Sequence, residues 1–521
     1  MRVGWTGRAP RKPIAIIAYT LVAMVVSLIV VTVGSTAIAE TPTQPKYGGI
    51  LRIAIPSDSV TLDPALLTTN SDIFVTQQVY EGLVRKKTDF TLEPQLAVSW
   101  LSNEDTTSWT FNLRRDVRFH SGKEFSAEDV VFTFDRLLDP NVPSPLRSQL
   151  KSVKDVAIVD KYTVRFDLTE PNGFLPDTLS QFQAQILDSG VDTSRLTTNV
   201  DGTGPFILNE FLAGQRAVFK RNPDYWGKPL PYLDEVVMFY MPGSETRLES
   251  LKSGDVDVVY PFSATDARAV KGVDLVKTSE VASPAYLDLA MDVTQSPFDN
   301  RKVRQAFQAA TDRQSVLQVA TLGSGVIGAD IPIPQNDPHF SPEVKVPSYD
   351  LQRARQLLTE AGYPNGIEVT LHTSDVIPGH VEMALAFKES AASAGITVNI
   401  QKHPEEVYWA DIWLQKAFKT VNWVGRNPND ALSVVLSCGA AWNESHYCNP
   451  EVDALIKRAA GQKDVESRRG TYLQIHRILV DDVPRIITVF TPVFMGLRDN
   501  VQGLSAHPGQ AMFLDKTWLG E

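Results

Sequence analysis

Cysteine and histidine are scarce in this sequence, which limits the metal sites that it can build. Among 521 residues there are two cysteines, Cys438 and Cys448, and eight histidines. The histidine nearest to both cysteines is His446, and these three residues do not complete the tetrahedral set of a zinc site. The other histidines are scattered without metal-ligand spacing. The sequence therefore predicts no metal site.

Catalytic motifs are missing as well. The sequence contains no G-x-S-x-G, no H-E-x-x-H and no phosphate-binding P-loop. One glycine-rich run, residues 323–328, matches G-x-G-x-x-G, but a helix is expected before it and prolines follow it. A dinucleotide site needs the opposite context, a strand before the run and a helix after it. We therefore predict that the protein is not an enzyme, with no catalytic residues and no cofactor.

Positive charge is in short supply beyond the N-terminus. The formal net charge is −11, and no basic tract follows the first dozen residues. Nucleic-acid binding depends on clustered basic side chains that neutralise phosphates, so nucleic acid is excluded as the main partner.

Long apolar runs are equally rare, and the one long run without charge spans residues 14–33. It follows several arginines and a lysine and precedes Ala37-Ile38-Ala39, the small-residue pattern of a cleavage site. We predict a signal peptide over residues 1–39 and export to the periplasm. A retained membrane anchor is the alternative, since about 20 apolar residues can span a bilayer.

The two cysteines are expected to form a disulfide. Export places the chain where disulfides persist. Cys438 and Cys448 are close in sequence, and Gly439, Asn443 and Ser445 between them give the short loop enough flexibility to close.

The chain is too long for one hydrophobic core, so two or more lobes are expected. Strand, helix and strand patterns follow one another at 233–240, 245–253 and 255–258, and a similar alternation returns after residue 350. This order predicts α/β lobes. Further helices are expected at 74–83 and 405–418.

The segment 202–226 is the most distinctive part of the sequence. Gly202, Gly204 and Pro205 predict a tight turn, because glycine tolerates positive φ and proline fixes φ. The loose alternation that follows, around a glycine-containing loop, predicts a β-hairpin over residues 206–219.

Five motifs, one of them in that segment, resemble the family of extracellular solute-binding proteins that serve oligopeptide, dipeptide and nickel ABC importers. They are G-G-x-L-R … L-D-P at 48–64, L-x-P-x-L-A-x-S-W at 92–100, L-R-x-x-V-x-F-H-x-G … A-x-D-V-x-F within 113–137, G-T-G-P-F … N-x-x-Y-W at 202–226, and D-x-x-x-A-x-x-L-L-x-E-A-G-Y-x-x-G at 350–366. The resemblance covers nearly the whole chain that follows the apolar run.

The resemblance implies an α/β, periplasmic-binding-protein-like two-lobe fold with an additional subdomain inserted in lobe I. The implied parts are lobe I at 40–75, 201–284 and 489–521, the inserted subdomain at 76–200, and lobe II at 285–488. It also implies a monomer that captures a peptide or peptide-like solute between the lobes and delivers it to the permease subunits of an ABC importer. Two alternatives stay open: a periplasmic sensor or chaperone that presents a ligand with this fold, and a nickel or metal-chelate binder.

Residues 421–430 occupy the place where dipeptide binders of that family carry an aspartate that pairs with the ligand's α-ammonium. This chain departs from the pattern. Arg426 lies near the position where the acid is expected, and Asp430 is the only carboxylate nearby. A guanidinium suits a carboxylate, so Arg426 is predicted to take a carboxylate of the ligand. A solvated arginine, or an ion pair with Asp430, is the alternative.

Aromatic residues surround this loop in the sequence. Tyrosine and tryptophan offer large apolar walls with one polar handle, which suits an enclosed organic ligand. Trp423, Trp442 and Tyr408 are predicted to contact the ligand together with Arg426 and Asp430, with core packing as the alternative.

Overall fold

The computed structural model describes residues 44–196, 200–375, 377–404 and 407–521. Contacts along the chain divide it into two units, Met1–Pro45 and Lys46–Glu521. The predicted signal peptide and its cleavage site lie outside the described residues. Everything below concerns the second unit.

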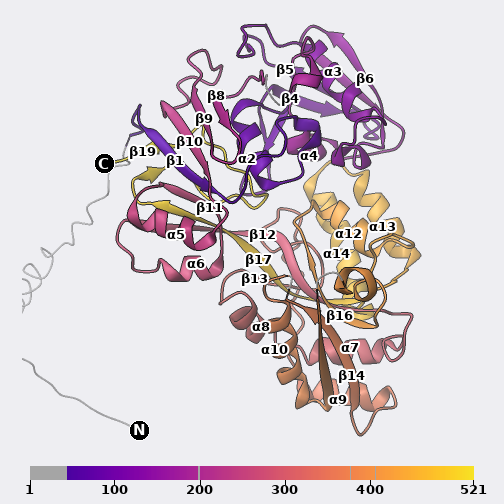
Figure 1. Ribbon diagram of the computed structural model, residues 1–521. Coiled ribbons are helices and arrows are strands. Elements are labelled where there is room, and N and C mark those ends of the chain that lie inside the picture. The colour runs from indigo at the N-terminus through magenta and orange to yellow at the C-terminus, as the bar shows by residue number, and fades with distance from the viewer. Residues whose placement is uncertain (1–43, 197–199, 376, 405–406) are drawn as a thin grey trace, which may run out of the picture. The chain divides into compact units, whose positions relative to one another are not determined.

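One mixed sheet runs through this unit. Among the described residues it has 11 strands, ordered β15-β14-β16-β12-β17-β11-β1-β10-β9-β8, with β13 paired to β17. Its two longest strands, β12 (Val276–Met291) and β17 (Arg485–Arg498), are antiparallel neighbours over most of their length. In Figure 1 these two strands lie side by side and connect the two halves of the sheet, which we call lobe I and lobe II.

Lobe I contains the strands at one end of this order. They are β1 (Ile50–Ile55), β8 (Phe206–Leu212), β9 (Arg216–Arg221), β10 (Glu235–Tyr240) and β11 (Val258–Phe262). Strand β1 is parallel to both of its neighbours, whereas β8 and β9 form the predicted antiparallel hairpin. The helices of this lobe are α2 (Asn70–Val79), α5 (Ser244–Ser253) and α6 (Ala264–Ala269). Apolar side chains of the strands and α2 form one buried core.

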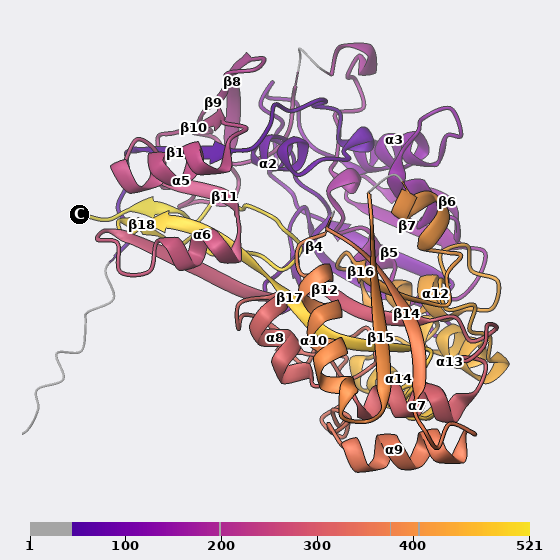
Figure 2. The ribbon, with the colours of Figure 1, turned by 60° about the horizontal axis from the view of Figure 1, so that its bottom comes forward.

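Lobe II contains the strands at the other end, β14 (Ile367–Ser374), β15 (Ile396–His403) and β16 (Phe418–Trp423), with the short β13 (Val326–Ile327). Its helices are α7 (Arg301–Ala309), α8 (Arg313–Ala320), α9 (Leu351–Glu360), α10 (His380–Ala392), α12 (Pro428–Leu436), α13 (Pro450–Ala460) and α14 (Val465–Asp482). Helix α10 packs against β14, β15 and β16 (Figure 2). The apolar faces of these helices and strands bury two neighbouring clusters.

The two long strands change register where they pass from one lobe to the other. Pairing shifts between Ala282 and Tyr286, opposite Phe490 to Pro492. The Ser283 hydroxyl donates to the Thr491 carbonyl oxygen at 2.7 Å, so the irregular stretch keeps side-chain bonds between its strands. A β-bulge of this kind bends a strand pair without separating it.

The inserted subdomain has its own sheet and core. The sheet order is β4-β5-β7-β6, with β4 (Ala97–Ser102), β5 (Ser108–Leu113), β6 (Val153–Asp160) and β7 (Thr163–Leu168). Helix α3 (Ala127–Leu138) packs on β6 and β7, and short elements such as β2 (Val84–Lys86), β3 (Leu92–Pro94) and α4 (Leu175–Thr178) complete the subdomain.

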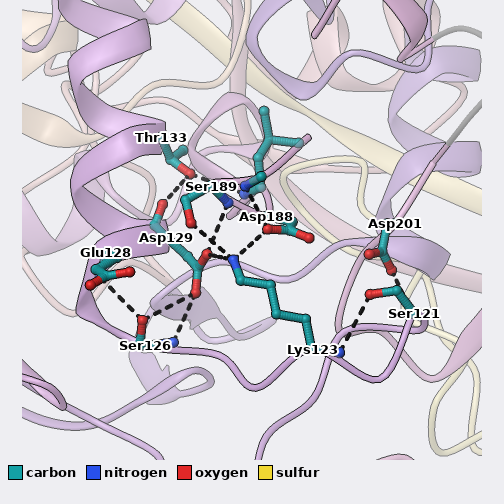
Figure 3. Close-up of polar contacts among 11 residues, drawn as sticks. Ser121, Lys123, Ser126, Glu128, Asp129, Thr133, Asp188, Ser189 and Asp201 are labelled. Atoms are coloured by element: carbon teal, nitrogen blue, oxygen red, sulfur yellow. Dashed lines mark hydrogen bonds and ion pairs between the residues drawn. The ribbon is translucent and has the colours of Figure 1, made fainter. Parts of the chain in front are cut away.

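Polar contacts fix the start of α3, as Figure 3 shows. Asp129 accepts from the Ser126 backbone N–H at 2.9 Å in a capping box. The Lys123 ammonium lies between the carboxylates of Asp129 and Asp188 and donates to the Ser189 hydroxyl at 2.9 Å. Because Asp129 is fully buried, these contacts satisfy a charge that would otherwise be costly.

Two predicted helices have other bounds in the structure. Helix α2 begins at Asn70, since Thr69 and Asp72 form a capping box, and it ends at Val79 because Tyr80 has an extended backbone. The free carbonyl oxygen of Val79 accepts from the Gly204 backbone N–H. Of the helix expected at 405–418, residues 405 and 406 lie outside the described residues. The described part contains a π-turn at Tyr408–Ile412, and Phe418 already begins β16.

Candidate functional site

The loop that carries Arg426 connects β16 to α12. Trp423 ends the strand, and Pro428 takes the first helical position, where its missing N–H costs nothing. Asn427 caps the helix, since its Oδ1 accepts from the Asp430 backbone N–H at 3.0 Å. The strand end and the capped helix together fix the backbone on either side of Arg426.

Arg426 lines a hollow whose walls come from lobe II, the inserted subdomain and the C-terminal segment. The lining residues are Lys86, Phe90, Asp177, Ser180, Gln181, Phe182, Pro284, Asp337, His339, Gly425, Arg426, Asn427, Pro428, His507, Pro508 and Gly509. Its volume is about 130 Å³, which is less than the roughly 300–1,000 Å³ of typical small-molecule sites. A solute of peptide size therefore needs some movement of the walls.

The Arg426 guanidinium has aromatic neighbours but no hydrogen-bonding partner in the described parts of the chain. Its Cζ lies 5.9 Å from the Trp423 ring centroid and 5.6 Å from that of Trp442. Its Nε is buried and unpartnered among the described residues. No ion pair joins it to Asp430 within the described ranges, so the predicted alternative of such a pair is not the observed geometry.

Asp430 is half-buried and bonded to the helix cap. Its Oδ2 accepts from the Asn427 side-chain amide at 2.6 Å. Burial raises the pKa of Asp430, while this hydrogen bond and the positive charge of Arg426 oppose the rise. The carboxylate therefore acts on Arg426 through its field and not through direct contact.

The three predicted aromatic residues differ in exposure. Trp442 is 48% exposed, whereas Trp423 is 6% exposed and its indole N–H donates to Oε1 of Glu444 at 3.2 Å. Tyr408 is completely buried, and its hydroxyl donates to the Thr420 carbonyl oxygen. Trp423 and Trp442, whose ring centroids lie 6.3 Å apart, form an aromatic wall beside Arg426. Of the five predicted contact residues, however, only Arg426 is among those that line the hollow.

A cluster of buried charges lies beneath that wall. Arg485 Nη1 is 3.0 Å from Oε1 of Glu444 and 3.1 Å from Oδ2 of Asp288. Lys419, also fully buried, donates to the Glu444 carbonyl oxygen, and burial lowers the pKa of Lys419 to about 8. Two acidic and two basic groups thus offset one another, which is the condition under which buried charges are tolerated.

Other side chains that line the hollow are already paired. The Lys86 ammonium lies 2.9 Å from Oδ1 of Asp177 in a partly buried ion pair. The backbone carbonyl of Lys86 lies 2.9 Å from Nε2 of His507, and Nδ1 of His507 accepts from the Gly509 backbone N–H at 3.1 Å. With one nitrogen donating and the other accepting, the ring fits its neutral form, and burial lowers the pKa of His507 to about 4.

Asp337 and His339 also line the hollow, and the sequence predictions did not single them out. Nδ1 of His339 lies 2.8 Å from Oδ1 of Asp337. The available signal was the short N-D-P-H string at 336–339, which combines an acid and a histidine across a proline turn. An aspartate and a histidine this close in sequence often have a purely structural role, so the pair does not identify a binding site until the fold is known.

The predicted cysteine pair is joined in the structure. Cys438 and Cys448 form a disulfide, with Cα atoms 4.5 Å apart. In the described ranges no group of three or more histidine, cysteine or carboxylate side chains is placed to hold a metal ion. Within the same ranges, every helix falls short of the length and apolarity needed to cross a membrane.

Comparisons with known proteins agree with the motifs. The family described as bacterial extracellular solute-binding proteins, family 5, matches residues 91–443. A relative named heme-binding protein A, from Haemophilus influenzae, is 32% identical over 473 residues, which cover 83% of this chain and 85% of the relative. A dipeptide-binding protein from Pseudomonas aeruginosa is 27% identical over 484 residues, covering 86% of this chain and 90% of that protein.

Solved structures give the same fold. HbpA2 from Haemophilus parasuis has a TM-score of 0.82 at 26% identity and covers 91% of this chain and 100% of that one. The periplasmic binding protein DppA from Helicobacter pylori, in complex with a peptide, has a TM-score of 0.71 at 26% identity, with coverages of 91% and 99%. The predicted α/β two-lobe fold is confirmed, and the chain belongs to the bacterial extracellular solute-binding proteins of family 5.

Proposed function

We propose that the protein is the periplasmic binding component of an ABC importer and that it captures a peptide-like solute bearing a carboxylate. The solute lies in the hollow between lobe II, the inserted subdomain and the C-terminal segment, with its carboxylate on Arg426. No bond chemistry is involved. The lobes close on the solute, and permease subunits accept it from the closed form.

One observation carries this proposal: the half-buried Arg426 lines the hollow without a hydrogen-bonding partner in the described residues. A guanidinium is a fixed cation with a planar fork of donors that matches a carboxylate. The other cation of the hollow, Lys86, is already paired with Asp177. Arg426 is therefore the better anchor for an incoming anion.

The nature of the solute draws on the relatives. One relative is named a dipeptide-binding protein, and one solved structure of similar fold is a periplasmic binding protein in complex with the peptide STSA. Such ligands carry a terminal carboxylate, which suits Arg426, and the Trp423–Trp442 wall supplies apolar surface for a side chain.

Export and delivery follow from the same proposal. A signal peptide at residues 1–39 would bring the chain to the periplasm, either free or tethered if the apolar run is retained. The protein acts as a monomer there, and the register shift in β12 and β17 is the place where the lobes hinge.

The test begins with native mass spectrometry of the protein purified from the periplasm, which identifies what co-purifies. Calorimetric titration with that solute then compares the wild type with Arg426→Ala and Arg426→Lys. Arg426→Ala should weaken binding by about 2–4 kcal/mol, because it leaves the carboxylate unpaired in the closed site. Arg426→Lys should recover part of the loss, since lysine lacks the bidentate fork.

Arg165→Ala is the matched control. Arg165 lies on β7, is exposed, and pairs with Asp167 outside the hollow. The Arg165→Ala variant should bind the solute as tightly as the wild type does. If Arg426→Ala binds within about threefold of the wild type, a difference of about 0.65 kcal/mol, the assignment of Arg426 is wrong.

Heme is a second candidate ligand, because the relative with 32% identity is named a heme-binding protein. Heme is a flat apolar ring with two carboxylates, so it would use the same aromatic wall and the same arginine. Titration with hemin, followed by the Soret absorbance, separates the two candidates. A saturable Soret change that a peptide does not displace would favour heme.

A further inference from the structure

The loop that precedes α4 reaches from the inserted subdomain to lobe II. The Gly173 backbone N–H donates to the Ala460 carbonyl oxygen at 2.5 Å. The Thr106 hydroxyl, from a neighbouring turn of the subdomain, donates to the Gly461 carbonyl oxygen at 3.2 Å. Phe174 is 4% exposed and packs in an apolar cluster of lobe II. We call Thr106, Gly173 and Phe174 the strap, because they connect the inserted subdomain with lobe II.

Arg468 of α14 receives the strap in lobe II. Its guanidinium carbon lies 4.2 Å from the Phe174 ring centroid, and its Nη1 donates to the Gly173 carbonyl oxygen at 3.3 Å. Arg468 is 6% exposed, and no ion pair joins it to a carboxylate among the described residues. A buried cation is costly unless its charge and its N–H groups find partners, and an aromatic face is one such partner. The strap therefore supplies part of what stabilises the buried Arg468.

The strap is also fixed within its own subdomain. The Trp109 indole N–H donates to the Asn172 carbonyl oxygen at 2.9 Å, and the Asn172 side-chain amide donates to the Ser152 hydroxyl at 3.1 Å. The Phe174 backbone N–H donates to Oδ1 of Asn172 at 2.9 Å. These contacts hold the loop in the conformation that presents the Phe174 ring, so less conformational entropy is lost when the ring packs in lobe II.

The strap lies next to the hollow but does not line it. The Phe174 ring centroid is 5.7 Å from that of His339, which lines the hollow from lobe II. Asp177 of α4, the helix that begins directly after Phe174, lines the hollow from the subdomain. Pro284, within the register shift of β12, lines it as well. The two sides of the hollow are thus connected both through the hinge strands and through the strap.

Separation of the lobes breaks the contacts of the strap. The inserted subdomain follows α2 and precedes β8, so it is attached to lobe I at both ends. When lobe II rotates about the register shift in β12 and β17, the Phe174 ring becomes exposed to water and Arg468 loses the ring and the Gly173 carbonyl oxygen. This cost opposes opening whether or not a solute is bound.

We propose that the strap holds the two lobes closed in the protein without solute, and that Phe174 and Arg468 are positioning residues that set the affinity for a solute they do not contact. The apparent affinity is the intrinsic affinity multiplied by the closed fraction, so a weaker strap lowers the affinity for every solute by the same factor. This inference goes beyond the proposed function, because it concerns the protein without solute and does not depend on Arg426 or on the identity of the solute.

The test measures the distance between the subdomain and lobe II by double electron–electron resonance. Spin labels are placed at Lys154→Cys in β6 and Lys457→Cys in α13, two exposed positions whose side chains have no hydrogen bond or ion pair within the described residues. Unfolding and refolding of the labelled, unreduced protein removes any co-purified solute. The otherwise wild-type protein should then show mainly the short distance of the described structure. With Thr106→Val and Phe174→Ala added, the ratio of closed to open molecules should fall about tenfold or more, so that the long distance dominates.

Two further variants distinguish closure from general stability. Val156→Ala is the matched control, because Val156 is 5% exposed and belongs to the core of the subdomain. It should lower the melting temperature and leave the distance distribution unchanged. Phe174→Leu keeps an apolar side chain but removes the ring beside Arg468, so it should give an intermediate distribution. If the Thr106→Val, Phe174→Ala protein does not fold, as judged by circular dichroism, Phe174→Leu and Thr106→Val alone still report on the strap.

The inference is overturned if the strap variants keep the distance distribution of the wild type, or if the wild type without solute already shows mainly the long distance. The radius of gyration from X-ray scattering should rise together with the long-distance fraction. Failure of the proposed function would appear elsewhere, as unchanged solute binding by Arg426→Ala, so the two failures are distinguishable.

Discussion

The indole N–H of Trp423 donates to Oε1 of Glu444 at 3.2 Å, and the same oxygen lies 3.0 Å from Nη1 of Arg485. One carboxylate oxygen thus connects the aromatic wall beside Arg426 with the buried charges below it. Arg485 belongs to β17, a strand shared by both lobes. The position of the wall therefore depends on the charge balance of the cluster.

Glu444→Gln should destabilise the fold. The substitution leaves Arg485 with Asp288 as its single acidic partner in the described cluster, and breaking a buried pair in this way costs about 3–5 kcal/mol. Urea denaturation measures the free energy of unfolding. The matched control is Glu466→Gln, because Glu466 pairs with Arg469 on the surface and should change stability by about 1 kcal/mol or less. Equal losses in both variants would show that the buried cluster does not stabilise the fold.

Removing the disulfide should lower stability moderately. Cys438 and Cys448 are separated by 10 positions. A disulfide that closes a loop of this length stabilises the folded state by about 3 kcal/mol, because it restricts the unfolded chain. The double variant Cys438→Ser, Cys448→Ser should therefore unfold at lower urea concentration. A thiol titration of the unfolded, unreduced wild type should find no free thiol, and two reactive thiols would contradict the pairing.

Acidification should destabilise the protein partly through His507. Burial lowers the pKa of His507 to about 4, below the value of about 6.5 in an unfolded chain. The unfolded state then binds the proton first, so the contribution of this residue is complete above about pH 6.5 and decreases as the pH falls toward 4. Between about pH 6.5 and about pH 5 the loss from this residue is about 1.6 kcal/mol.

His507→Gln isolates that contribution. A glutamine side chain offers one donor for the Lys86 carbonyl oxygen and one acceptor for the Gly509 N–H, without titrating. Urea denaturation at both pH values should show a smaller loss in the variant than in the wild type. An identical pH dependence in the two proteins would mean that His507 does not titrate in this range.

The sequence predicted the two-lobe architecture correctly, but it did not predict why particular residues are needed for that architecture. Gly202 and Gly204 were predicted to supply positive φ, but the structure gives them ordinary φ values and a different role. A Cβ at Gly202 would lie 2.0 Å from the Val79 carbonyl oxygen, and one at Gly204 would lie 2.5 Å from that of Gln78. The motif allows a close approach between segments more than a hundred residues apart, which local patterns do not reveal.

The candidate site shows the same limit. Arg426 and its loop could be found from the sequence, because they depart from a known motif at a known place. Asp337, His339 and Lys86 could not, since they reach the hollow only when the loop before α9, the end of β2 and the C-terminal segment come together. Tyr408 was grouped with the ligand contacts by sequence proximity, yet its ring lies inside lobe II.

A contact between the inserted subdomain and lobe II leads to the last prediction. The Gly173 backbone N–H donates to the Ala460 carbonyl oxygen at 2.5 Å, and Phe174 beside it is buried in the apolar cluster of lobe II. The Arg468 guanidinium lies 4.2 Å from the Phe174 ring centroid. The inserted subdomain thus contacts lobe II through the loop at Gly173 and Phe174, and this loop has no room for a residue larger than glycine at position 173.

Gly173→Ala should weaken this contact. The added Cβ would lie 2.2 Å from the Gln462 carbonyl oxygen, and a backbone atom cannot move aside as a flexible side chain can. Overpacking of this kind costs about 1–3 kcal/mol. Gly470→Ala is the control: Gly470 lies within α14 with no atom near its Cβ position in the described residues, so alanine should stabilise the helix by about 0.5–1 kcal/mol. Gly173→Ala should therefore lower the melting temperature and speed hydrogen exchange near residue 173. Gly470→Ala should leave that exchange unchanged and give an equal or higher melting temperature. A Gly173→Ala protein with the melting temperature and exchange of the wild type would show that the loop is not in tight contact with lobe II in solution.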